Sequence, residues 1–199
     1  MKIRIIDYGV GNLHSISKGL EKTGAKVEIV TDPKALLDAG GIVFPGVGAF
    51  GAAMDVLQPV LPQLRKAIAS GTPTLGVCLG MQILFDRSEE SPGEGISAIK
   101  GEVRRINADR VPHMGWNNVQ ASDDPLFEGI RTDTQFYFAN SFVCHPTQKV
   151  GIAETRYGET FVSAVRKGSI YGVQFHPEKS GLPGLRLLSN FVSISEGST

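Results

Sequence analysis

The stretch TPTLGVCLGMQILF, Thr72 to Phe85, begins with turn-forming residues, continues as a short apolar run and passes through GVCLG into a second apolar run. The first run, TLGVC, is typical of a buried strand, and LGMQILF is typical of a helix that follows it. Strands joined to helices in this way build α/β proteins with a parallel sheet. The stretch therefore predicts that fold class, provided that the neighbouring segments repeat the pattern.

Strand-like runs and helical patterns alternate from the amino end up to this stretch. Leu13, Ile16 and Leu20 fall on one helical face, while Lys18 and Glu21 fall elsewhere, as a helix that covers a sheet requires. Near-continuous apolar strands are typical of a parallel sheet that is buried on both faces. We expect strands at residues 2–6, 26–30, 41–44 and 74–78, and helices at 12–25, 33–40 and 53–71.

Beyond about residue 92 the chain becomes rich in strands. Strand-like runs separated by turn residues occur at 96–106, 134–143, 149–158, 159–168 and 169–175, and a closing helix is expected at 182–195. We therefore expect one α/β domain spanning residues 1–199. Its core would be an open, mostly parallel, twisted sheet with helices on both faces, extended by antiparallel strands.

Composition excludes several classes of protein. Hydrophobic residues make up 41% of the 199 residues, and the 20 basic and 20 acidic residues cancel, so no broad attraction to nucleic acid or to an anionic membrane is expected. No apolar run is long enough to cross a bilayer, and MKIRIIDYG is too short and too acidic for a signal peptide. Two cysteines cannot form a disulfide framework. We expect a cytoplasmic protein.

The residues that follow each predicted parallel strand are the first candidates for a binding site, because ligands of open α/β sheets bind beyond the carboxyl ends of the strands. Four segments meet this criterion: DYGVGN at 7–12, PGVGAFG at 45–51, GVCLG at 76–80 and FHPEKS at 175–180.

Cys78 in GVCLG has the setting of a catalytic nucleophile. Flanking glycines permit a sharp turn between strand and helix, which would expose the thiol at the tip of the strand. The amino end of the following helix would favour the thiolate. A buried structural cysteine is the alternative on residue type alone, and we assign that role to Cys144, which lies within a predicted strand.

FHPEKS supplies the partners that a nucleophilic cysteine needs. His176 follows a predicted strand, and Glu178 would point to the same side of an extended backbone, so its carboxylate can orient the imidazole. The backbone N–H of Leu79 is suited to stabilise an oxyanion, and PGVGAFG is the best source of a second donor. Read instead as G-x-G-x-x-G, PGVGAFG lies outside the first βα unit and lacks the later acidic residue of a dinucleotide site. We expect no metal and no cofactor.

PGVGAFG, GVCLGMQ and FHPEK together resemble the class I, triad-type glutamine amidotransferases. With DYGVGN and PHMGWN added, the resemblance extends over nearly the whole chain. Within the family, the chain most closely resembles the branch that supplies ammonia to a TIM-barrel cyclase in histidine biosynthesis. The resemblance implies a flavodoxin-like arrangement of the sheet.

The resemblance implies a role for each of these segments. Cys78 would attack the side-chain amide of glutamine, and His176, held by Glu178, would act as base and then protonate departing ammonia. Donors to the oxyanion would come from Leu79 and from Val47 and Gly48. The loop of the last two residues is thought to be misoriented at rest in the family, and we expect Gly46 and Gly48 to permit its reorientation when the partner is loaded.

The resemblance also implies residues that bind glutamine and the cyclase. Those for glutamine are Gln82, Glu90 and the main chain at Ser141 and Phe142, although the sequence has Asn140 and Phe142 where His and Tyr are commoner. Those for the partner are Asn12, His113, Trp116 and Lys179.

Two other classes of function stay open at this stage. Another triad amidotransferase would share the chemistry but not the partner. A stand-alone Cys-His hydrolase of peptides or γ-glutamyl chains would work at full rate alone, and an inactive regulatory module with the same fold would keep its function in Cys78→Ala.

Overall fold

The computed structural model describes residues 2–9 and 13–197, which form the α/β architecture predicted from the sequence. The parallel part of the sheet runs in the order β2, β1, β3, β4, β12. Its strands are β1 (Lys2–Ile6), β2 (Lys26–Val30), β3 (Gly41–Phe44), β4 (Thr74–Val77) and β12 (Ile170–Val173).

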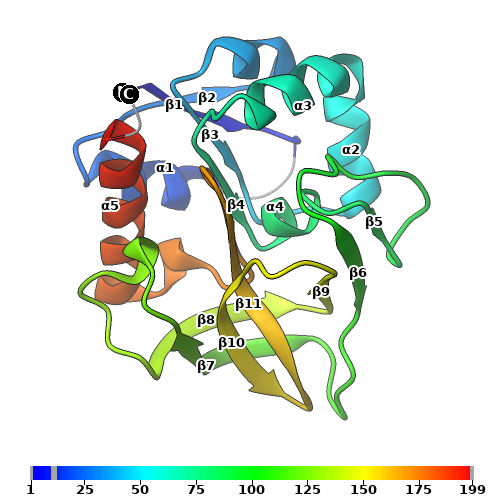
Figure 1. Ribbon diagram of the computed structural model, residues 1–199, viewed down its shortest axis with the longest axis vertical. Coiled ribbons are helices and arrows are strands. Elements are labelled where there is room, and N and C mark those ends of the chain that lie inside the picture. The colour runs from blue at the N-terminus through cyan, green and yellow to red at the C-terminus, as the bar shows by residue number, and fades with distance from the viewer. Residues whose placement is uncertain (1, 10–12, 198–199) are drawn as a thin grey trace.

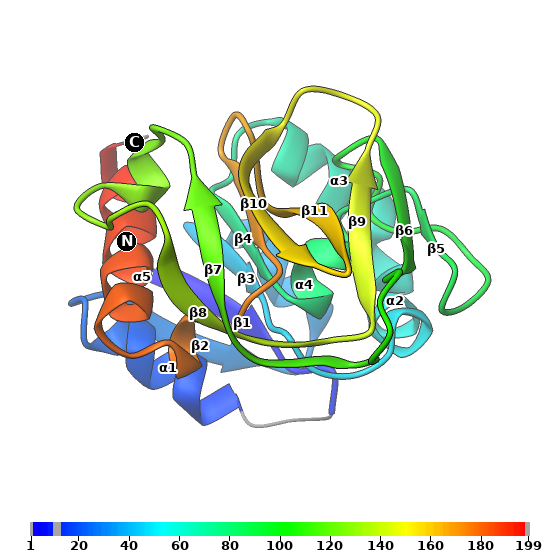
Figure 2. The same ribbon diagram turned by 90° about the horizontal axis from the view of Figure 1, so that it is seen from below.

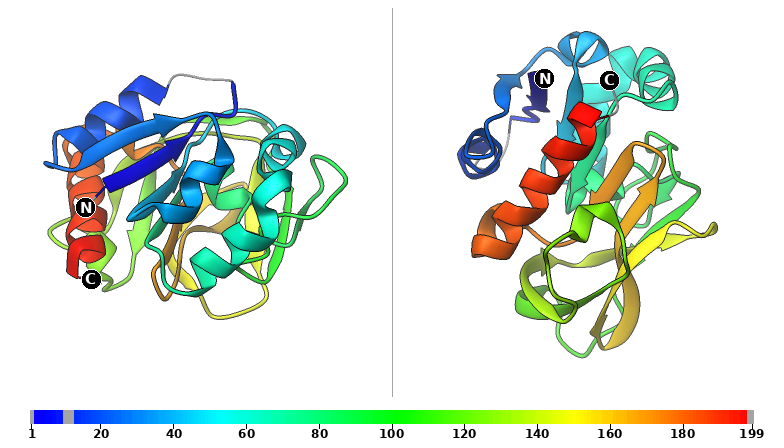
Figure 3. Two further views of the ribbon diagram at one scale, coloured as in Figure 1. Left: turned by 90° about the horizontal axis from the view of Figure 1, so that it is seen from above. Right: turned by 60° about the vertical axis from the view of Figure 1, so that its left-hand side comes forward.

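Helices cover both faces of the parallel strands (Figure 1 and Figure 3). One face carries α1 (Leu13–Glu21) and α5 (Gly181–Gly197), and the other carries η1 (Pro33–Asp38), α2 (Phe50–Leu57), η2 (Gln58–Val60) and α3 (Leu61–Ala69). Strand β3 shows why: Val43 packs in the core cluster with α1 and α5, whereas Ile42 and Phe44 pack in the cluster with α2 and α3. Alternate residues of a strand point to opposite faces, so this fully apolar strand requires a cover on both sides.

The helices on the second face are shorter than the sequence pattern predicts. The helix expected at 53–71 is divided into α2, η2 and α3, with Pro59 and Pro62 each near the start of a new segment. Proline lacks the N–H that a continuous helix needs but is tolerated in a first turn. The helix expected at 33–40 is the 3₁₀ segment η1, which the side chain of Asp32 caps by accepting a hydrogen bond from Lys34 N.

The remaining strands extend the sheet beyond β12, with antiparallel pairs in every case but that of the two-residue strand 87–88 (Figure 1 and Figure 2). Strand β11 (Glu159–Lys167) pairs with β12, followed by β10 (Gly151–Tyr157), β7 (His113–Ala121) and β8 (Thr134–Asn140). A side branch off β11 contains β9 (Phe142–Pro146), β6 (Gly101–Arg105) and the short β5 (Arg87–Ser88). The 3₁₀ segments η3 (Pro125–Phe127) and η4 (Pro177–Lys179) lie in the connections.

Two features of this half differ from the prediction. The single run at 134–143 is two strands, β8 and β9, which meet at Ser141 and pair with different partners. Strand β7 contains PHMGWN from its histidine onward, a segment for which the sequence pattern predicts no strand. Its alternation of exposed and buried positions is masked in the sequence by glycine and asparagine.

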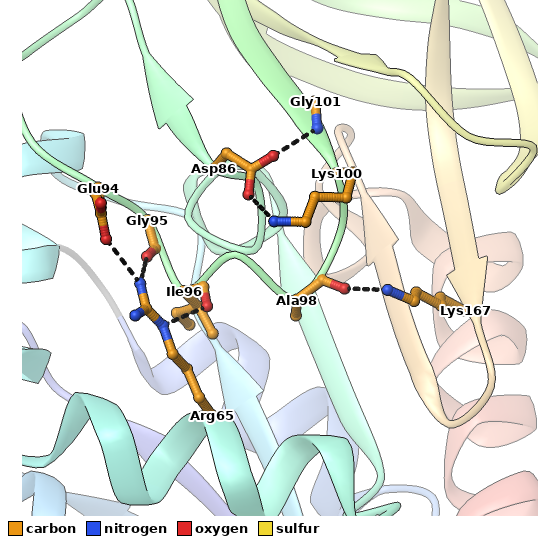
Figure 4. Close-up of polar contacts among 9 residues, drawn as sticks. All are labelled: Arg65, Asp86, Glu94, Gly95, Ile96, Ala98, Lys100, Gly101 and Lys167. Carbon is orange, nitrogen blue, oxygen red and sulfur yellow. Dashed lines mark hydrogen bonds and ion pairs between the residues drawn. The ribbon is translucent and has the colours of Figure 1, made fainter.

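The segment between Asp86 and Gly101 leads from the parallel half of the sheet to β6 and is held in place by several hydrogen bonds (Figure 4). The Asp86 carboxylate accepts hydrogen bonds from Lys100 Nζ and from Gly101 N, both at 3.0 Å. Arg65 of α3 donates to the carbonyl oxygens of Gly95 and Ile96, each at 2.8 Å. These contacts hold the segment that carries Glu90, whose carboxylate reaches Phe50 N beyond the carboxyl end of β3.

Among the described helices, none is both long and apolar enough to span a bilayer.

Candidate functional site

Cys78 lies at a sharp turn between β4 and α4 (Leu79–Gln82). Its backbone has φ of +48° and ψ of −104°, a conformation that non-glycine residues rarely adopt and that is frequent at functional sites. The flanking glycines are required by packing. A Cβ on Gly76 would lie 2.4 Å from the carbonyl oxygen of Gly80, and a Cβ on Gly80 would lie 1.9 Å from that of Phe44. The predicted turn between strand and helix is present.

The helix after Cys78 is shorter than expected. Helix α4 contains four residues and continues as single turns through Phe85, instead of forming a regular helix over LGMQILF. A dipole grows with the number of aligned peptide units, so one turn gives the thiol little support.

His176 and Glu178 follow β12 as predicted. Glu178 is the second residue of the η4 turn, two residues after His176, and its Oε1 lies 2.8 Å from His176 Nδ1. Both side chains are largely buried, with relative exposures of 3% and 9%. A carboxylate bound to Nδ1 leaves Nε2 of the imidazole for chemistry.

The pKa of His176 is raised by its polar neighbours. Burial by itself lowers the pKa, but hydrogen bonds with Cys78 and Glu178, together with their negative charges, outweigh burial and raise it from 6.5 to about 10. At neutral pH this raised pKa keeps the His176 imidazole protonated beside the sulfur, in the form that can give a proton to a leaving group.

A cavity of about 330 Å³ brings the predicted site residues together. Its lining includes most of the residues predicted for chemistry and for glutamine binding: Gly46, Val47, Gly48, Cys78, Leu79, Gln82, Glu90, Ser141, Phe142, His176 and Lys179. Glu178 is not part of this wall and contacts His176 instead. The four larger cavities found in the described part of the chain are lined by neither cysteine nor histidine.

The glycine-rich loop packs directly against the reactive side chains. A Cβ on Gly46 would lie 2.9 Å from His176 Cε1 and 3.0 Å from Cys78 Cβ, so a side chain at this position would displace one of them. Gly48 has φ of +109°, which favours glycine. The loop can therefore approach the thiol with its backbone.

The residues predicted to bind glutamine have further partners within the protein. Glu90 Oε2 accepts a hydrogen bond of 2.7 Å from Phe50 N, which places a negative charge at the amino end of α2. Gln82 Nε2 donates to the carbonyl oxygen of Phe142 at 3.1 Å. The carbonyl oxygen of Ser141 accepts from Ile106 N. Both carbonyl oxygens are thus engaged internally, which leaves the Glu90 carboxylate as the clearest charged group at this wall.

Comparisons with known proteins agree with this geometry. A family model described as Glutamine amidotransferase class-I matches residues 4–194. The chain belongs to the class-I glutamine amidotransferases.

Relatives of this amidotransferase carry a more specific name. The chain is 45% identical over 195 residues to a Methanocaldococcus jannaschii protein named imidazole glycerol phosphate synthase subunit HisH, covering 96% of this chain and 99% of the relative. A protein of the same name from Thermococcus kodakarensis is 46% identical, with 95% and 98% covered. The solved structure of PurLQS from Thermotoga maritima matches with a TM-score of 0.77 at 18% identity, covering 97% of this chain and 98% of that chain, and supports the fold alone.

Next to the cavity, the amidotransferase exposes an aromatic and apolar surface. Trp116 of β7 is 54% exposed and contacts Tyr137 of β8 edge-on, with 6.1 Å between ring centroids. Lys179 Nζ lies 5.7 Å from the centroid of the Tyr137 ring. Met114, 66% exposed, is paired in register with Ala139, next to the cavity lining. We call Met114, Trp116, Tyr137 and Lys179 the β7–β8 surface.

One residue predicted to contact a partner, His113, is placed differently. The structure buries His113, at 2% exposure, between the rings of Phe138 and Tyr157, so its side chain is part of the core and not of the β7–β8 surface. Burial lowers its pKa from 6.5 to about 4. The strand alternation that exposes Met114 and Trp116 turns His113 inward. Asn12 lies outside the described residues.

Sequence reasoning missed Met114, Tyr137 and Gln174. Met114 and Tyr137 become neighbours of Trp116 and Lys179 through strand pairing and loop packing, which no local pattern reveals. Gln174 lies two residues before His176, and its position in an otherwise apolar run was an available signal. Cys144 is buried, and burial raises the pKa of its thiol well above the usual range, in keeping with a packing role.

Proposed function

We propose that this amidotransferase is the glutaminase subunit of an imidazole glycerol phosphate synthase. It would hydrolyse glutamine to glutamate and pass the ammonia to a cyclase subunit. The observation that carries the proposal is that Cys78 and His176, with Glu178 behind the imidazole, open onto one cavity in a chain about 45% identical to proteins named as this synthase's subunit HisH.

In the proposed reaction, the Cys78 thiolate attacks the side-chain carbonyl carbon of glutamine. A bond between sulfur and carbon forms, and the carbonyl oxygen becomes an oxyanion. The His176 imidazolium then gives its proton to the amide nitrogen, the carbon–nitrogen bond breaks, and ammonia leaves a γ-glutamyl thioester on Cys78. His176, now neutral, accepts a proton from water as the water attacks the thioester, which releases glutamate and restores the resting pair.

Backbone N–H groups would stabilise the oxyanion. Leu79 follows the nucleophile directly and lines the cavity, and the Val47–Gly48 peptide lies in the loop that packs against Cys78. A single donor of this kind contributes about 3 kcal/mol to the transition state. Because Gly48 tolerates conformations closed to other residues, the loop can turn its amide toward or away from the oxyanion, which would couple the rate to events at the partner.

Glutamine would be held at its amino-acid end by the opposite wall. The Glu90 carboxylate suits the α-ammonium group, since an acid that caps a helix remains able to bind a cation with its other oxygen. Gln82 would contribute polar contacts together with the main chain at Ser141 and Phe142.

The β7–β8 surface would dock on a TIM-barrel cyclase. Exposed Met114 and Trp116 form an apolar centre, and Lys179 lies at the rim of the glutaminase cavity, so a partner seated here would close the way by which ammonia could escape. The cyclase would combine the ammonia with its phosphorylated nucleotide substrate to give imidazole glycerol phosphate and AICAR. The phosphates would be bound by the cyclase, which fits the net charge of zero here. We place the complex in the cytoplasm.

A trapping experiment tests the chemistry directly. Rapid acid quenching of the chain mixed with glutamine and the cyclase, followed by mass spectrometry, should detect one γ-glutamyl group on the peptide that contains Cys78. The adduct should be absent in Cys78→Ala and unaffected in Cys144→Ala. An adduct on Cys144, or glutamate release without any adduct in Cys78→Ala, would refute the assignment of the nucleophile.

A further inference from the structure

Gln174 is a polar side chain buried completely beside the nucleophile. It follows β12 with a relative exposure of 0%. Its Nε2 lies 3.4 Å from Cys78 Sγ, and its Oε1 lies 3.3 Å from Gln82 Nε2. An amide removed from water costs free energy unless both of its ends are bonded. Here both ends are bonded, and one of the partners is the sulfur.

The orientation of the Gln174 amide is set by a chain of hydrogen bonds. The carbonyl oxygen of Phe142 can only accept, so the group 3.1 Å from it must be the NH₂ of Gln82. The second hydrogen of that NH₂ requires an acceptor, which is Gln174 Oε1. The NH₂ of Gln174 is therefore directed at Cys78 Sγ. A flipped amide would place two NH₂ groups in contact and a carbonyl oxygen against the sulfur.

Two polar neighbours of the sulfur, Ala139 and Gln174, lie outside the triad and have opposite effects on the ionisation of the Cys78 thiol. The carbonyl oxygen of Ala139, 3.8 Å from Sγ, accepts from a thiol but repels a thiolate. Gln174 offers a donor, and hydrogen bonds to an ionised acceptor are about twice as strong as those between neutral groups. The short helix α4 gives little help from its amino end. Apart from His176, Gln174 is thus the side chain placed to favour the charged form.

We propose that Gln174 is a positioning residue, which holds Cys78 Sγ toward the cavity and favours its thiolate through an N–H donor fixed by Gln82 and Phe142. Gln174 does not line the cavity, so it acts on the substrate through the sulfur and not by contact. The proposal rests on the proposed function only in taking Cys78 as the nucleophile.

The test is the pH dependence of Cys78 alkylation by iodoacetamide, since the thiolate is the reactive form. In a Cys144→Ala background, the full chain would be compared with Gln174→Met, which keeps the length of the side chain but removes both polar atoms. The midpoint of the rate profile should move upward by about one pH unit, equivalent to a tenfold change in the thiolate equilibrium. Gln135→Met, an exposed glutamine of β8, is the matched control and should leave the midpoint unchanged.

A second variant keeps the test decisive. Gln174→Glu keeps the shape of the side chain and replaces the donor by a carboxylate, so its midpoint should also rise, whether or not Gln174→Met folds. Equal midpoints in the parent chain and in a variant with the parent's circular dichroism spectrum would overturn the proposal. The readout is independent of glutamine: a chain that hydrolyses no glutamine in any state would contradict the proposed function, and the alkylation midpoints would still decide the role of Gln174.

Discussion

Replacing His113 by phenylalanine should reduce the loss of unfolding free energy that this protein shows as the pH falls below 6.5. His113 is stacked between Tyr157, at 4.0 Å between ring centroids, and Phe138, at 4.5 Å. Asn117 Nδ2 lies 3.2 Å from His113 Nε2 and also donates to the carbonyl oxygen of Arg156, so Nε2 acts as the acceptor and the proton lies on Nδ1. A second proton, on Nε2, would face the Nδ2 donor of Asn117, and the positive charge would be buried between two apolar rings.

The magnitude follows from the pKa values of the two states. The pKa of His113 is about 4 in the folded protein and 6.5 as the ordinary value, so between these limits the unfolded chain binds a proton that the folded chain does not. Stability therefore falls as the pH drops from 6.5 toward 4 and is unaffected by this group above 6.5. At pH 4.5 the loss amounts to about 2.5 kcal/mol, which is a large share of the stability of a typical domain.

Urea unfolding followed by far-ultraviolet circular dichroism at pH 7.5 and 4.5 measures the effect. The difference in unfolding free energy between the two pH values should be smaller in His113→Phe by about 2.5 kcal/mol. Phenylalanine keeps the stack, so the variant should remain folded at pH 7.5. In Asn117→Asp, a carboxylate that accepts from a protonated His113 replaces the amide that donates to it, so the difference in unfolding free energy between the two pH values should also become smaller. An identical difference in the parent protein and His113→Phe would refute the reasoning.

Three further substitutions test the site. Gly80→Ala forces a Cβ to within 1.9 Å of the carbonyl oxygen of Phe44 and should lower the free energy of unfolding by about 3 kcal/mol, measured by urea titration; wild-type stability would contradict the turn geometry. Trp116→Ala should weaken cyclase binding by about 2 kcal/mol, roughly thirtyfold in Kd by calorimetry, and an unchanged Kd would remove Trp116 from the interface. Glu178→Gln should lower kcat for glutamate release by about 100-fold, whereas Glu89→Gln, whose carboxylate binds Arg105 N, should not; equal effects would argue against the triad.

The parallel half of the fold was predictable from local patterns. Buried strands such as 41–44 and the amphipathic helix at Leu13–Glu21 carry their periodicity in the sequence, and the structure confirms both. Prolines at 59 and 62 explain why one predicted helix is three segments. The break at Ser141 could not be predicted, since it depends on the pairing of β8 with β7 and of β9 with β6 and β11, which no local pattern shows.

The candidate site was predictable where its chemistry is local. GVCLG and FHPEKS each place a reactive group just beyond a strand, and parallel pairing of β4 with β12 brings the two together. The orientation of His113 was not predictable, because a shift of one residue along a strand exchanges buried and exposed faces. The polar residue Gln174 stands out in an apolar run of the sequence, but its contact with Cys78, like that of Tyr137 with Lys179, joins distant segments and is visible only in the folded structure.

Glutamate release from glutamine, measured in three states of the same preparation, tests the central claim most directly. The states are the chain alone, the chain with the cyclase, and the complex with the nucleotide substrate of the cyclase or a product analogue. We expect a low rate for the chain alone, a rise of orders of magnitude in the loaded complex, and no release in any state with Cys78→Ala. Full activity of the chain alone would contradict control by the partner and would indicate an independent hydrolase, and activity that survives Cys78→Ala would contradict the account as a whole.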